Sequence, residues 1–297
     1  MTQIHAIING KPITAEPGMT ILQAARANGI YIPTLCDHPA LSPFGACRVC
    51  LVEAEKNPKL LTSCTTPITE GMVVHTNTPR VIEARKAVVE LILVRHPLDC
   101  FSCSSNGKCE LQEVAYELGI KGSRFADPGD TNDSHRLEDA NPFYVRDMNK
   151  CILCGRCVRT CIDVQEVGVL EARHRSNQVE ISTFMEKPLA DVVCINCGQC
   201  TNMCKRGGMT ERIEYPRIRR LTEDASRVLI ASTSPAVRVA LGESFGLEPG
   251  TDCEGKMVAA LRRIGFHHVL DTTFSADVTV VEEASELVRR LDTSASS

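Results

Sequence analysis

Cysteines at short, repeated intervals dominate the chemistry that this chain could perform. The pattern C-x2-C-x2-C-x3-C occurs twice between residues 151 and 204. The first run consists of Cys151, Cys154, Cys157 and Cys161, and the second of Cys194, Cys197, Cys200 and Cys204. Thiolates at this spacing hold cubane clusters, with three ligands from one run and the fourth from the other. The runs therefore predict two interlocked [4Fe–4S] clusters, one on Cys151, Cys154, Cys157 and Cys204 and one on Cys194, Cys197, Cys200 and Cys161.

Zinc is the alternative metal, because paired C-x2-C motifs bind it tetrahedrally. A zinc site needs four thiolates, but it gives no reason for a third cysteine after two residues and a fourth after three. The spacing therefore favours iron. The proline that usually follows the fourth cysteine is Ile162 in one run and Lys205 in the other. This change is expected to loosen the turn without removing a ligand.

Four earlier cysteines have the spacing C-x10-C-x2-C-x13-C. They are Cys36, Cys47, Cys50 and Cys64. Gly45 and Ala46 provide a small-residue loop that could wrap closely around inorganic sulfur. Four thiolates on loops beside a sheet are typical of a [2Fe–2S] site, although the first gap is longer than the plant-type spacing. A zinc site or two disulfides is the alternative, and strands expected at 50–53 and 72–76 favour the cluster.

A histidine completes another set, spaced H-x3-C-x2-C-x5-C. Its members are His96, Cys100, Cys103 and Cys109. A lone histidine at a helix end is usually a charge that interacts favourably with the helix dipole. Three cysteines are one ligand short of a cubane set, however, and an imidazole nitrogen can supply the fourth bond. A neutral ligand makes this [4Fe–4S] cluster one charge less negative, which favours its reduced form unless hydrogen bonds offset the change.

Fifteen cysteines and His96 thus form four sets of four, and only Cys253 is left over. We interpret Cys253 as a structural or incidental thiol, since no second ligand lies near it in the sequence. One [2Fe–2S] and three [4Fe–4S] clusters predict a one-electron conduit. The sequence has no G-x-G-x-x-G after a strand, no Walker loop and no evident flavin or nicotinamide site. Conversion of single electrons to hydride would therefore require a partner.

Composition excludes several other functions. The 297-residue chain has a net charge of −4 and no basic block, which argues against nucleic-acid binding. Its start has no secretion signal, so sixteen cysteines are expected in a reducing cytoplasm. The longest apolar stretch, 87–94, contains Glu90 and is far shorter than the ~20 residues that a bilayer requires. Direct membrane insertion is not expected.

The elements that must position the first ligands are strands and short helices. Alternation over 2–8 and 11–15 around Asn9-Gly10 predicts a type I′ hairpin. A helix over 21–28 is expected to be capped by Thr20 and terminated by Gly29.

Further helices are expected at 80–95, before Pro97, and at 110–118, before Gly119. The apolar face of the first is expected to consist of Val81, Ala84, Val88, Leu91 and Ile92. Arg85 is expected on another face. Residues 126–142 are typical of a surface linker with solvated acidic side chains, and 179–184 of a strand between the cubane runs.

After residue 220 the pattern changes to alternating strands and helices. We expect a buried strand at 227–232, helices at 236–245 and 256–264, a strand at 268–271, a helix at 276–291 and a disordered tail at 292–297. The predicted fold class is α+β. Its expected domains are a [2Fe–2S] ferredoxin β-grasp domain (1–78), a His-ligated [4Fe–4S] module (79–125), a linker (126–142), a double-cubane ferredoxin-like domain (143–220) and a truncated α/β piece (221–297).

At the level of motifs, residues 1–220 resemble the iron–sulfur front end shared by the large peripheral subunit of respiratory complex I and the large subunit of multimeric [FeFe] hydrogenases. The resemblance rests on the stretches 35–41 and 45–50, on the His96 set and on the two cubane runs. The second run favours the hydrogenase branch. Segments 234–243, 255–262 and 276–279 resemble the opening of the hydrogenase catalytic domain, whose cysteines for the hydrogen-activating cluster come later in that family.

The resemblance implies a subunit of a flavin-based electron-bifurcating complex, such as an NAD(P)H/ferredoxin transhydrogenase or a hydrogenase-like formate dehydrogenase. It implies partners that carry FMN and bind NAD(P), a small thioredoxin-like [2Fe–2S] subunit and ferredoxin. The histidine-ligated and [2Fe–2S] clusters would lie toward the flavin subunit and the cubane pair toward the far end. An adaptor for a separate catalytic subunit, or the amino-terminal part of an active hydrogenase, is the alternative.

Overall fold

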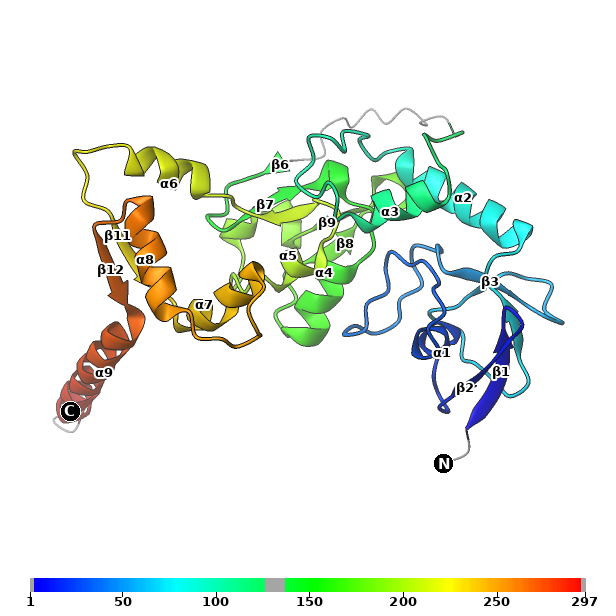
Figure 1. The fold of residues 1–297 in the computed structure, drawn as a ribbon, viewed down its shortest axis with the longest axis horizontal. Helices are drawn as coiled ribbons and strands as arrows, with labels where there is room; N and C mark the ends of the chain where they lie inside the picture. Colours follow the sequence, from blue (N-terminus) through cyan, green and yellow to red (C-terminus); the bar gives the residue numbers. More distant parts are fainter. Residues whose placement is uncertain (1–2, 126–136, 295–297) are drawn as a thin grey trace. The chain divides into compact units, whose positions relative to one another are not determined.

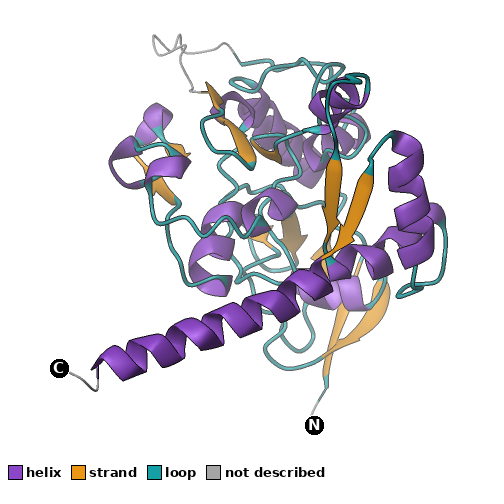
Figure 2. Ribbon diagram, turned by 90° about the vertical axis from the view of Figure 1, so that its left-hand side faces the viewer, coloured by secondary structure: helices purple, strands orange, loops and turns teal. Residues whose placement is uncertain are grey.

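The computed structural model describes residues 3–125 and 137–294. The chain forms two compact units, Met1–Arg212 and Ile213–Ser297, each a mixture of helices and sheets (Figures 1 and 2). This mixed composition agrees with the predicted α+β class. The boundary expected after residue 220 falls inside helix α6 (Tyr215–Thr222), which belongs to the second unit.

The first unit begins with a five-stranded mixed sheet of order β2-β1-β5-β3-β4. Its strands are β1 (Ile4–Ile8), β2 (Lys11–Ala15), β3 (Leu51–Ala54), β4 (Leu61–Thr62) and β5 (Val73–His75). β1 and β2 are antiparallel, and Asn9 and Gly10 between them have φ of 52° and 77°. Two successive positive φ values are characteristic of the type I′ turn, so the predicted hairpin is confirmed.

Helix α1 (Ile21–Ala27) covers this sheet with a fully apolar inner face. The Thr20 side chain accepts from the Gln23 backbone N–H, while the Gln23 side chain accepts from the Thr20 N–H. This reciprocal capping box satisfies two backbone donors that the helix itself cannot pair. The helix and its predicted cap are confirmed.

Helix α2 (Pro79–Leu93) is also found, but its buried face differs from the expected one. Arg85 is only 5% exposed, whereas Leu91 is 57% exposed. Arg85 donates to the carbonyl oxygens of Val49, Leu51 and Thr76, at 2.8, 2.8 and 3.2 Å. The periodicity argument was wrong here because it assigns arginine to solvent, while this buried guanidinium donates to three backbone carbonyls.

Helix α3 (Glu110–Glu117) begins directly after Cys109 and ends before Gly119, which has φ of 66°, as predicted. Its buried residues Leu111, Val114 and Ala115 pack in one core with Val89 of α2 and with residues of the first cysteine loop. The histidine-containing segment and the first cysteine loop are therefore held against the same apolar surface.

The remainder of the first unit carries the two cysteine runs. A three-stranded antiparallel sheet of order β10-β7-β6 is formed by β6 (Leu137–Glu138), β7 (Tyr144–Asp147) and β10 (Met209–Glu211). Short helices follow the cysteines, namely α4 (Arg156–Arg159), η2 (Thr160–Val164) and α5 (Gln199–Met203). Strands β8 (Glu171–Arg173) and β9 (Glu180–Ser182) form a hairpin, which confirms the strand expected near 179–184 with narrower bounds. Single helical turns are η1 (Met148–Lys150), η3 (Ser176–Gln178), η4 (Phe184–Glu186) and η5 (Leu189–Asp191).

The expected linker lies partly outside the described residues, since 126–136 are not described. The part that is described is not a solvated loop. Glu138 of β6 is 7% exposed, forms an ion pair with Arg146 at 2.7 Å and accepts a hydrogen bond from the Leu189 N–H. The prediction of solvated acidic side chains is therefore wrong for Glu138, whose partners come from distant parts of the sequence.

The second unit contains the predicted alternation of strands and helices. Its elements after α6 are β11 (Ile230–Thr233), α7 (Pro235–Ala240), η6 (Leu241–Phe245), α8 (Glu254–Ile264), β12 (His268–Asp271) and α9 (Thr272–Ser294). β11 and β12 pair in parallel as a two-stranded sheet. The expected buried strand is wrong in that Ile230 is 57% exposed, because so small a sheet leaves one face uncovered. The described part of the expected tail, 292–294, is helical, and 295–297 lie outside the described residues.

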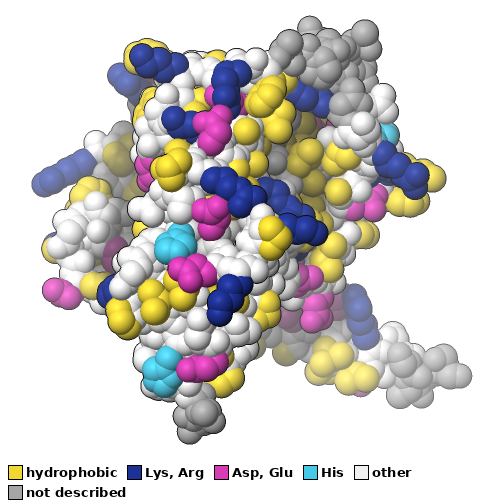
Figure 3. Space-filling model, turned by 90° about the vertical axis from the view of Figure 1, so that its right-hand side faces the viewer, with side chains coloured by type: hydrophobic (Ala, Val, Ile, Leu, Met, Phe, Trp, Pro, Cys, Tyr) yellow, Lys and Arg dark blue, Asp and Glu magenta, His cyan; other side chains and the backbone are white. Residues whose placement is uncertain are grey.

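Two surface properties bear on the predicted exclusions. On the face drawn in Figure 3, basic side chains form a short band flanked by acidic ones, with small apolar groups between them. Across residues 3–125 and 137–294, every helix is too short or too polar to cross a membrane.

Candidate iron–sulfur sites

All four cysteines of the first set are buried in loops beside the five-stranded sheet. Cys36, Cys50 and Cys64 are each 1% exposed, and Cys47 is 9% exposed. Every cysteine of the chain lies among the described residues, and none of them forms a disulfide. The alternative of two disulfides is therefore not realised in the structure.

The thiols of this set contact one another. A hydrogen bond with Cys47 lowers the pKa of Cys36, and the same bond raises the pKa of Cys47. Cys36 likewise raises the pKa of Cys64 through a hydrogen bond. Four thiolates this close repel one another unless a cation lies between them. The donor set thus fits a cluster whose iron supplies positive charge.

The loop around these thiols is fixed by its backbone. Gly45 has φ of 70°, in the left-handed region, and a Cβ there would lie 3.1 Å from Thr65 Cγ2. The hydroxyl of Ser63 donates to the carbonyl of Cys50 at 2.8 Å. Together with the three hydrogen bonds of Arg85, these contacts predispose the loop to one conformation.

The histidine-containing set lies between α2 and α3. The Nδ1 atom of His96 is buried and has no hydrogen-bond partner among the described residues. Burial lowers the pKa of His96, which favours the neutral imidazole that metals bind. Burial raises the pKa of Cys109, and the nearby Cys103 adds to that shift. A buried ring nitrogen without a partner, in the same segment of the chain as these thiols, fits the predicted fourth ligand.

The structure brings together each of the two crossed cubane sets. One cavity is lined by Cys151, Cys154, Cys157 and Cys204, and another by Cys161, Cys194, Cys197 and Cys200. Burial raises the pKa of Cys157 strongly, followed by the effect of Cys151, Cys154 and Cys204. Burial and then Cys197 and Cys194 raise the pKa of Cys200 to about 12, with a smaller effect of Cys161. Both cavities thus collect four thiols from two distant runs, as a cubane requires.

A glycine in each run creates this arrangement. Gly155 and Gly198 have φ of 66° and 76° and stand directly before α4 and α5. This left-handed residue turns the chain so that a helix begins between the second and third cysteines. Near the second run, Gly207 lacks a Cβ that would lie 3.3 Å from Cys103 Sγ. The cubane region therefore approaches the histidine-containing set closely.

Three buried arginines were missed by sequence reasoning. Arg156, Arg159 and Arg206 are 3%, 7% and 2% exposed. Arg156 donates to Glu110 Oε1 at 2.9 Å and to the Asp37 carbonyl at 2.6 Å. The sequence did offer a signal, because each of these arginines lies two residues after a predicted cysteine ligand.

The other two arginines also contact the first cysteine loop. Arg159 donates to the carbonyls of Ser42 and of Cys36, the latter at 2.5 Å. Arg206 donates to the Leu35 carbonyl at 2.5 Å and to Glu110 Oε2 at 2.6 Å. Side chains of the cubane region therefore fix the backbone of the first cysteine loop.

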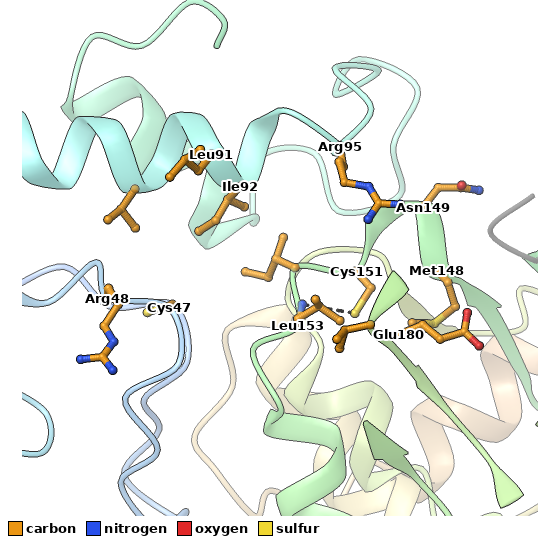
Figure 4. A pocket seen from close by; sticks show the side chains of 13 residues that line it. Cys47, Arg48, Leu91, Ile92, Arg95, Met148, Asn149, Cys151, Leu153 and Glu180 are labelled. Carbon is orange, nitrogen blue, oxygen red and sulfur yellow. Dashed lines mark hydrogen bonds between the residues drawn. The ribbon is translucent and has the colours of Figure 1, made fainter. Parts of the chain in front are cut away.

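A cavity of about 380 Å³ separates the first cysteine set from the first cubane set (Figure 4). Cys47 lies on one side and Cys151 on the other, with Leu91 and Ile92 of α2 above them. The Leu153 N–H donates to Cys151 Sγ at 3.4 Å. Ligands of two predicted sites thus face the same space.

One further group of metal-binding residue types lies at the β8–β9 hairpin and the helical turn η4 that follows it. Single ligand atoms of His174, Glu180 and Glu186 lie within 4.8 Å of one another. His174 and Glu186 are partly exposed and form an ion pair at 2.9 Å. The ion pair accounts for their proximity.

Family models match four consecutive parts of the chain. Residues 1–79 match a 2Fe-2S iron-sulfur cluster binding domain, and 85–124 match the NADH-ubiquinone oxidoreductase-G iron-sulfur binding region. Residues 141–210 match the ferredoxin-like domain of NADH-quinone oxidoreductase subunit 3. Residues 227–297 match the C-terminal domain of the iron only hydrogenase large subunit.

Curated relatives point the same way. NADP-reducing hydrogenase subunit HndD of Solidesulfovibrio fructosivorans is 45% identical over 296 residues, which are 98% of this chain and 50% of that protein. Iron hydrogenase 1 of Clostridium pasteurianum is 32% identical over 96% of this chain and 50% of its own length. The NADH-ubiquinone oxidoreductase 78 kDa subunit of Neurospora crassa is 37% identical over 71% of this chain and 28% of its length.

The chain is a homologue of these hydrogenase and oxidoreductase subunits. The resemblance inferred from the cysteine motifs is thereby confirmed. The chain spans half or less of the length of these relatives. Among solved structures, a chain of an NAD+-reducing [NiFe]-hydrogenase in the H2-reduced state superposes with a TM-score of 0.65 at 28% identity. The superposition covers 70% of the chain described here and 87% of the hydrogenase chain.

Proposed function

We propose that this homologue is an iron–sulfur electron-transfer subunit of a multisubunit NAD(P)H/ferredoxin oxidoreductase. It would relay single electrons between a flavin subunit and ferredoxin or a further redox subunit. The observation that carries the proposal is that three sets of four cysteines are each brought together within the single unit Met1–Arg212, which also contains the His96 set. A chain of one-electron carriers is the function that such an arrangement supports best.

We assign one [2Fe–2S] cluster to the first cysteine set, in a β-grasp domain at 1–78. A [4Fe–4S] cluster is assigned to the His96 set in module 79–125. Two more [4Fe–4S] clusters are assigned to the crossed sets in the ferredoxin-like domain 143–220, after the linker 126–142. Residues 221–297 would be a hydrogenase-like α/β domain. Mutual contact of the thiols and the orphaned nitrogen of His96 support these assignments.

The chain's own residues would perform three tasks in this function. Thiolates and one imidazole hold the clusters, which supply one-electron transfer when bound. Burial of Cys36, Cys50 and Cys64 excludes water from the ligands of the first site. The arginines and Arg85 hold the loops at fixed separation, so that the distance between carriers does not vary.

The remaining parts of the proposal concern the complex. We propose partners that carry FMN and bind NAD(P), a small thioredoxin-like [2Fe–2S] subunit, ferredoxin and, in one version, a separate catalytic subunit. The complex would be cytoplasmic and would couple its electron transfers by bifurcation. The printed names of relatives that reduce NADP or oxidise NADH support a nicotinamide-linked partner.

Iron analysis and partner identification test this function. The subunit purified anaerobically with its complex should contain about 14 irons per copy, from three [4Fe–4S] clusters and one [2Fe–2S] cluster. Assays with NADH, NADPH, ferredoxin, hydrogen and formate, followed by identification of co-purified subunits, then define the reaction. A clearly lower iron content, or purification without any flavin-containing partner, would contradict the proposal.

Participation in hydrogen chemistry is a second candidate. The match of residues 227–297 to the hydrogenase C-terminal domain favours it. An intact native mass well above 32.5 kDa, together with hydrogen-dependent reduction of the clusters, would support it. A native mass of 32.5 kDa without such reduction would leave the relay function as the better account.

A further inference from the structure

The two cubane sets are related by a repeat of 43 residues, but the charges beside them differ. Each pair of equivalent positions can be compared because the cysteine spacing is identical in the two runs. The equivalent pairs, first-cluster position first, are Arg156 and Gln199, Arg159 and Asn202, and Arg206 and Asp163. The order of the third pair is reversed because the fourth ligands cross: Arg206 comes two residues after Cys204, a ligand of the first cluster, and Asp163 two residues after Cys161, a ligand of the second. Every difference makes the surroundings of the first set more positive.

The folded structure preserves this asymmetry. The cavity enclosed by Cys151, Cys154, Cys157 and Cys204 is also lined by Lys150, Arg156 and Arg206. In the part of the chain that is described, the cavity enclosed by the other set has no charged side chain in its lining, which apart from the thiols consists of Tyr144, Thr160, two glutamines, Gly198 and apolar residues. Two pockets with the same backbone design therefore have different electrostatic surroundings, one lined by cations and one without charged side chains.

Arg206 contacts residues at or next to three predicted cluster sites. Its Nη1 lies 4.0 Å from Cys154 Sγ, and its Nη2 donates to Leu35, next to Cys36, and to Glu110, next to Cys109. One guanidinium thus touches segments that hold the first cubane, the [2Fe–2S] set and the histidine-containing set.

The buried positive charge is not balanced by carboxylates among the described residues. Arg156 and Arg206 share one carboxylate, that of Glu110. Arg159 donates to two carbonyls and lies 5.0 Å from the Phe44 ring centroid. The Nε atoms of all three arginines are buried and have no hydrogen-bond partner in the described structure.

Buried cations require nearby anions, because removing a charge from water is costly. A cluster held by four thiolates is an anion, and gaining one electron adds a further negative charge without any change of atoms. A fixed cation therefore stabilises the reduced cluster more than the oxidised one. Exposure of Cys197 to water stabilises a reduced second cluster as well, but solvent around an exposed ligand is a weaker influence than an unscreened buried charge.

We propose that Arg206, assisted by Arg156, sets the reduction potential of the cluster at Cys151, Cys154, Cys157 and Cys204 above that of the cluster at Cys194, Cys197, Cys200 and Cys161. The first cubane is then the member of the pair that is reduced first. The second is the low-potential member of the pair, from which an electron passes to an acceptor. Arg206 is a positioning residue for this transfer. The inference rests on the cluster assignment proposed above and does not depend on the identity of any partner.

Redox titration of the full chain with all clusters bound, followed by electron paramagnetic resonance, tests the proposal. Arg206→Gln should lower the potential of the higher-potential cubane only. At a fixed ambient potential, its ratio of reduced to oxidised cluster should fall at least tenfold, which is a shift of about 59 mV for a one-electron couple. Gln199→Arg, at the equivalent of Arg156, should raise the potential of the other cubane. Dithionite serves as the reductant in both titrations.

Three controls separate charge from folding. Arg206→Lys keeps the charge and should retain most of the wild-type potential. Arg173→Gln removes a charge elsewhere in the same region, on β8, and should leave both cubane potentials unchanged. Iron content must stay at the wild-type value in each variant. If iron content is unchanged and Arg206→Gln shifts the potential of neither cubane, or of both equally, the proposal is wrong. If Arg206→Gln fails to fold, the potentials of Gln199→Arg test the proposal instead. Loss of iron in the wild-type chain would instead contradict the cluster assignment.

Discussion

The two cysteine runs share a backbone design but differ in the charged side chains beside their clusters. Each has a left-handed glycine, a short helix that starts after the second cysteine and a fourth cysteine that crosses to the other set. Arginines within the first run and directly after the second, all beside the first cubane set, reach the preceding cysteine loop. Duplication has therefore preserved the ligands, while the charges and the tertiary contacts of the copies have diverged.

The size of this difference can be estimated. A unit charge about 4 Å away contributes about 4 kcal/mol at an effective dielectric constant of about 20, but about 1 kcal/mol in bulk water. Arg206 is 2% exposed and lies 4.0 Å from Cys154 Sγ, so the larger figure is the relevant one. The charge asymmetry outweighs the effect of water at the exposed Cys197.

The largest expected effect comes from breaking the crossing of ligands. Cys204→Ser lies in the second run, but it should remove the first cubane and leave the second intact. Iron content should fall by up to about four per chain, and one cubane signal should disappear from the paramagnetic resonance spectrum. Cys253→Ser, which removes the buried thiol outside all four sets, is the control and should retain all iron. Loss of the signal that Gln199→Arg shifts would show that the ligands do not cross.

A smaller effect is expected from removing an arginine that joins the two regions. Arg159→Ala deletes charge-assisted hydrogen bonds to the carbonyls of Ser42 and Cys36. The free energy of unfolding should fall by about 2–3 kcal/mol, and the [2Fe–2S] absorbance should be lost sooner on heating. Asn202→Ala at the equivalent position of the second run removes an exposed side chain and should change stability by less than about 0.5 kcal/mol. An equal loss of stability in the two variants would show that the arginine contacts do not distinguish the first run from the second.

The smallest expected effect is a difference in stability between alanine substitutions at Gly155 and at Gly198. Alanine at either position pays the cost of the left-handed conformation, about 1–2 kcal/mol. In Gly155→Ala the new Cβ would also lie 2.9 Å from Phe44 Cε1, whereas in Gly198→Ala the nearest atom is Tyr144 Oη at 3.5 Å. Thermal unfolding of the loaded protein should show a lower midpoint for Gly155→Ala. The reverse order would indicate that Phe44 does not pack against the first run.

Local features of the fold were predictable from the sequence. The Asn9-Gly10 turn, the Thr20 cap and the glycine after α3 depend on residues within a few positions of one another. The grouping of the cysteines followed from their spacing in the same way. The alternation of helices and strands in the second unit was also evident, with predicted ends that lie within four residues of the observed ones.

Features that depend on distant partners were not predictable. Arg85 and Glu138 are buried because carbonyls or an arginine from elsewhere in the fold satisfy them, and a periodicity argument treats both types as solvent-facing. Arg206 is the extreme case, since its carbonyl partner Leu35 is 171 residues away. Comparison of the two runs position by position would have identified the charge difference, but not its contacts.

The distance between Arg206 and Leu35 has a consequence for biosynthesis. Chains are synthesised from the amino terminus at roughly 5–20 residues per second, and early domains fold first. The loop that contains Cys36 is complete long before Arg159 and Arg206 leave the ribosome, so during that interval its carbonyls lack these two guanidinium donors. The described conformation of the loop can therefore be completed only after the last cysteine run has been synthesised.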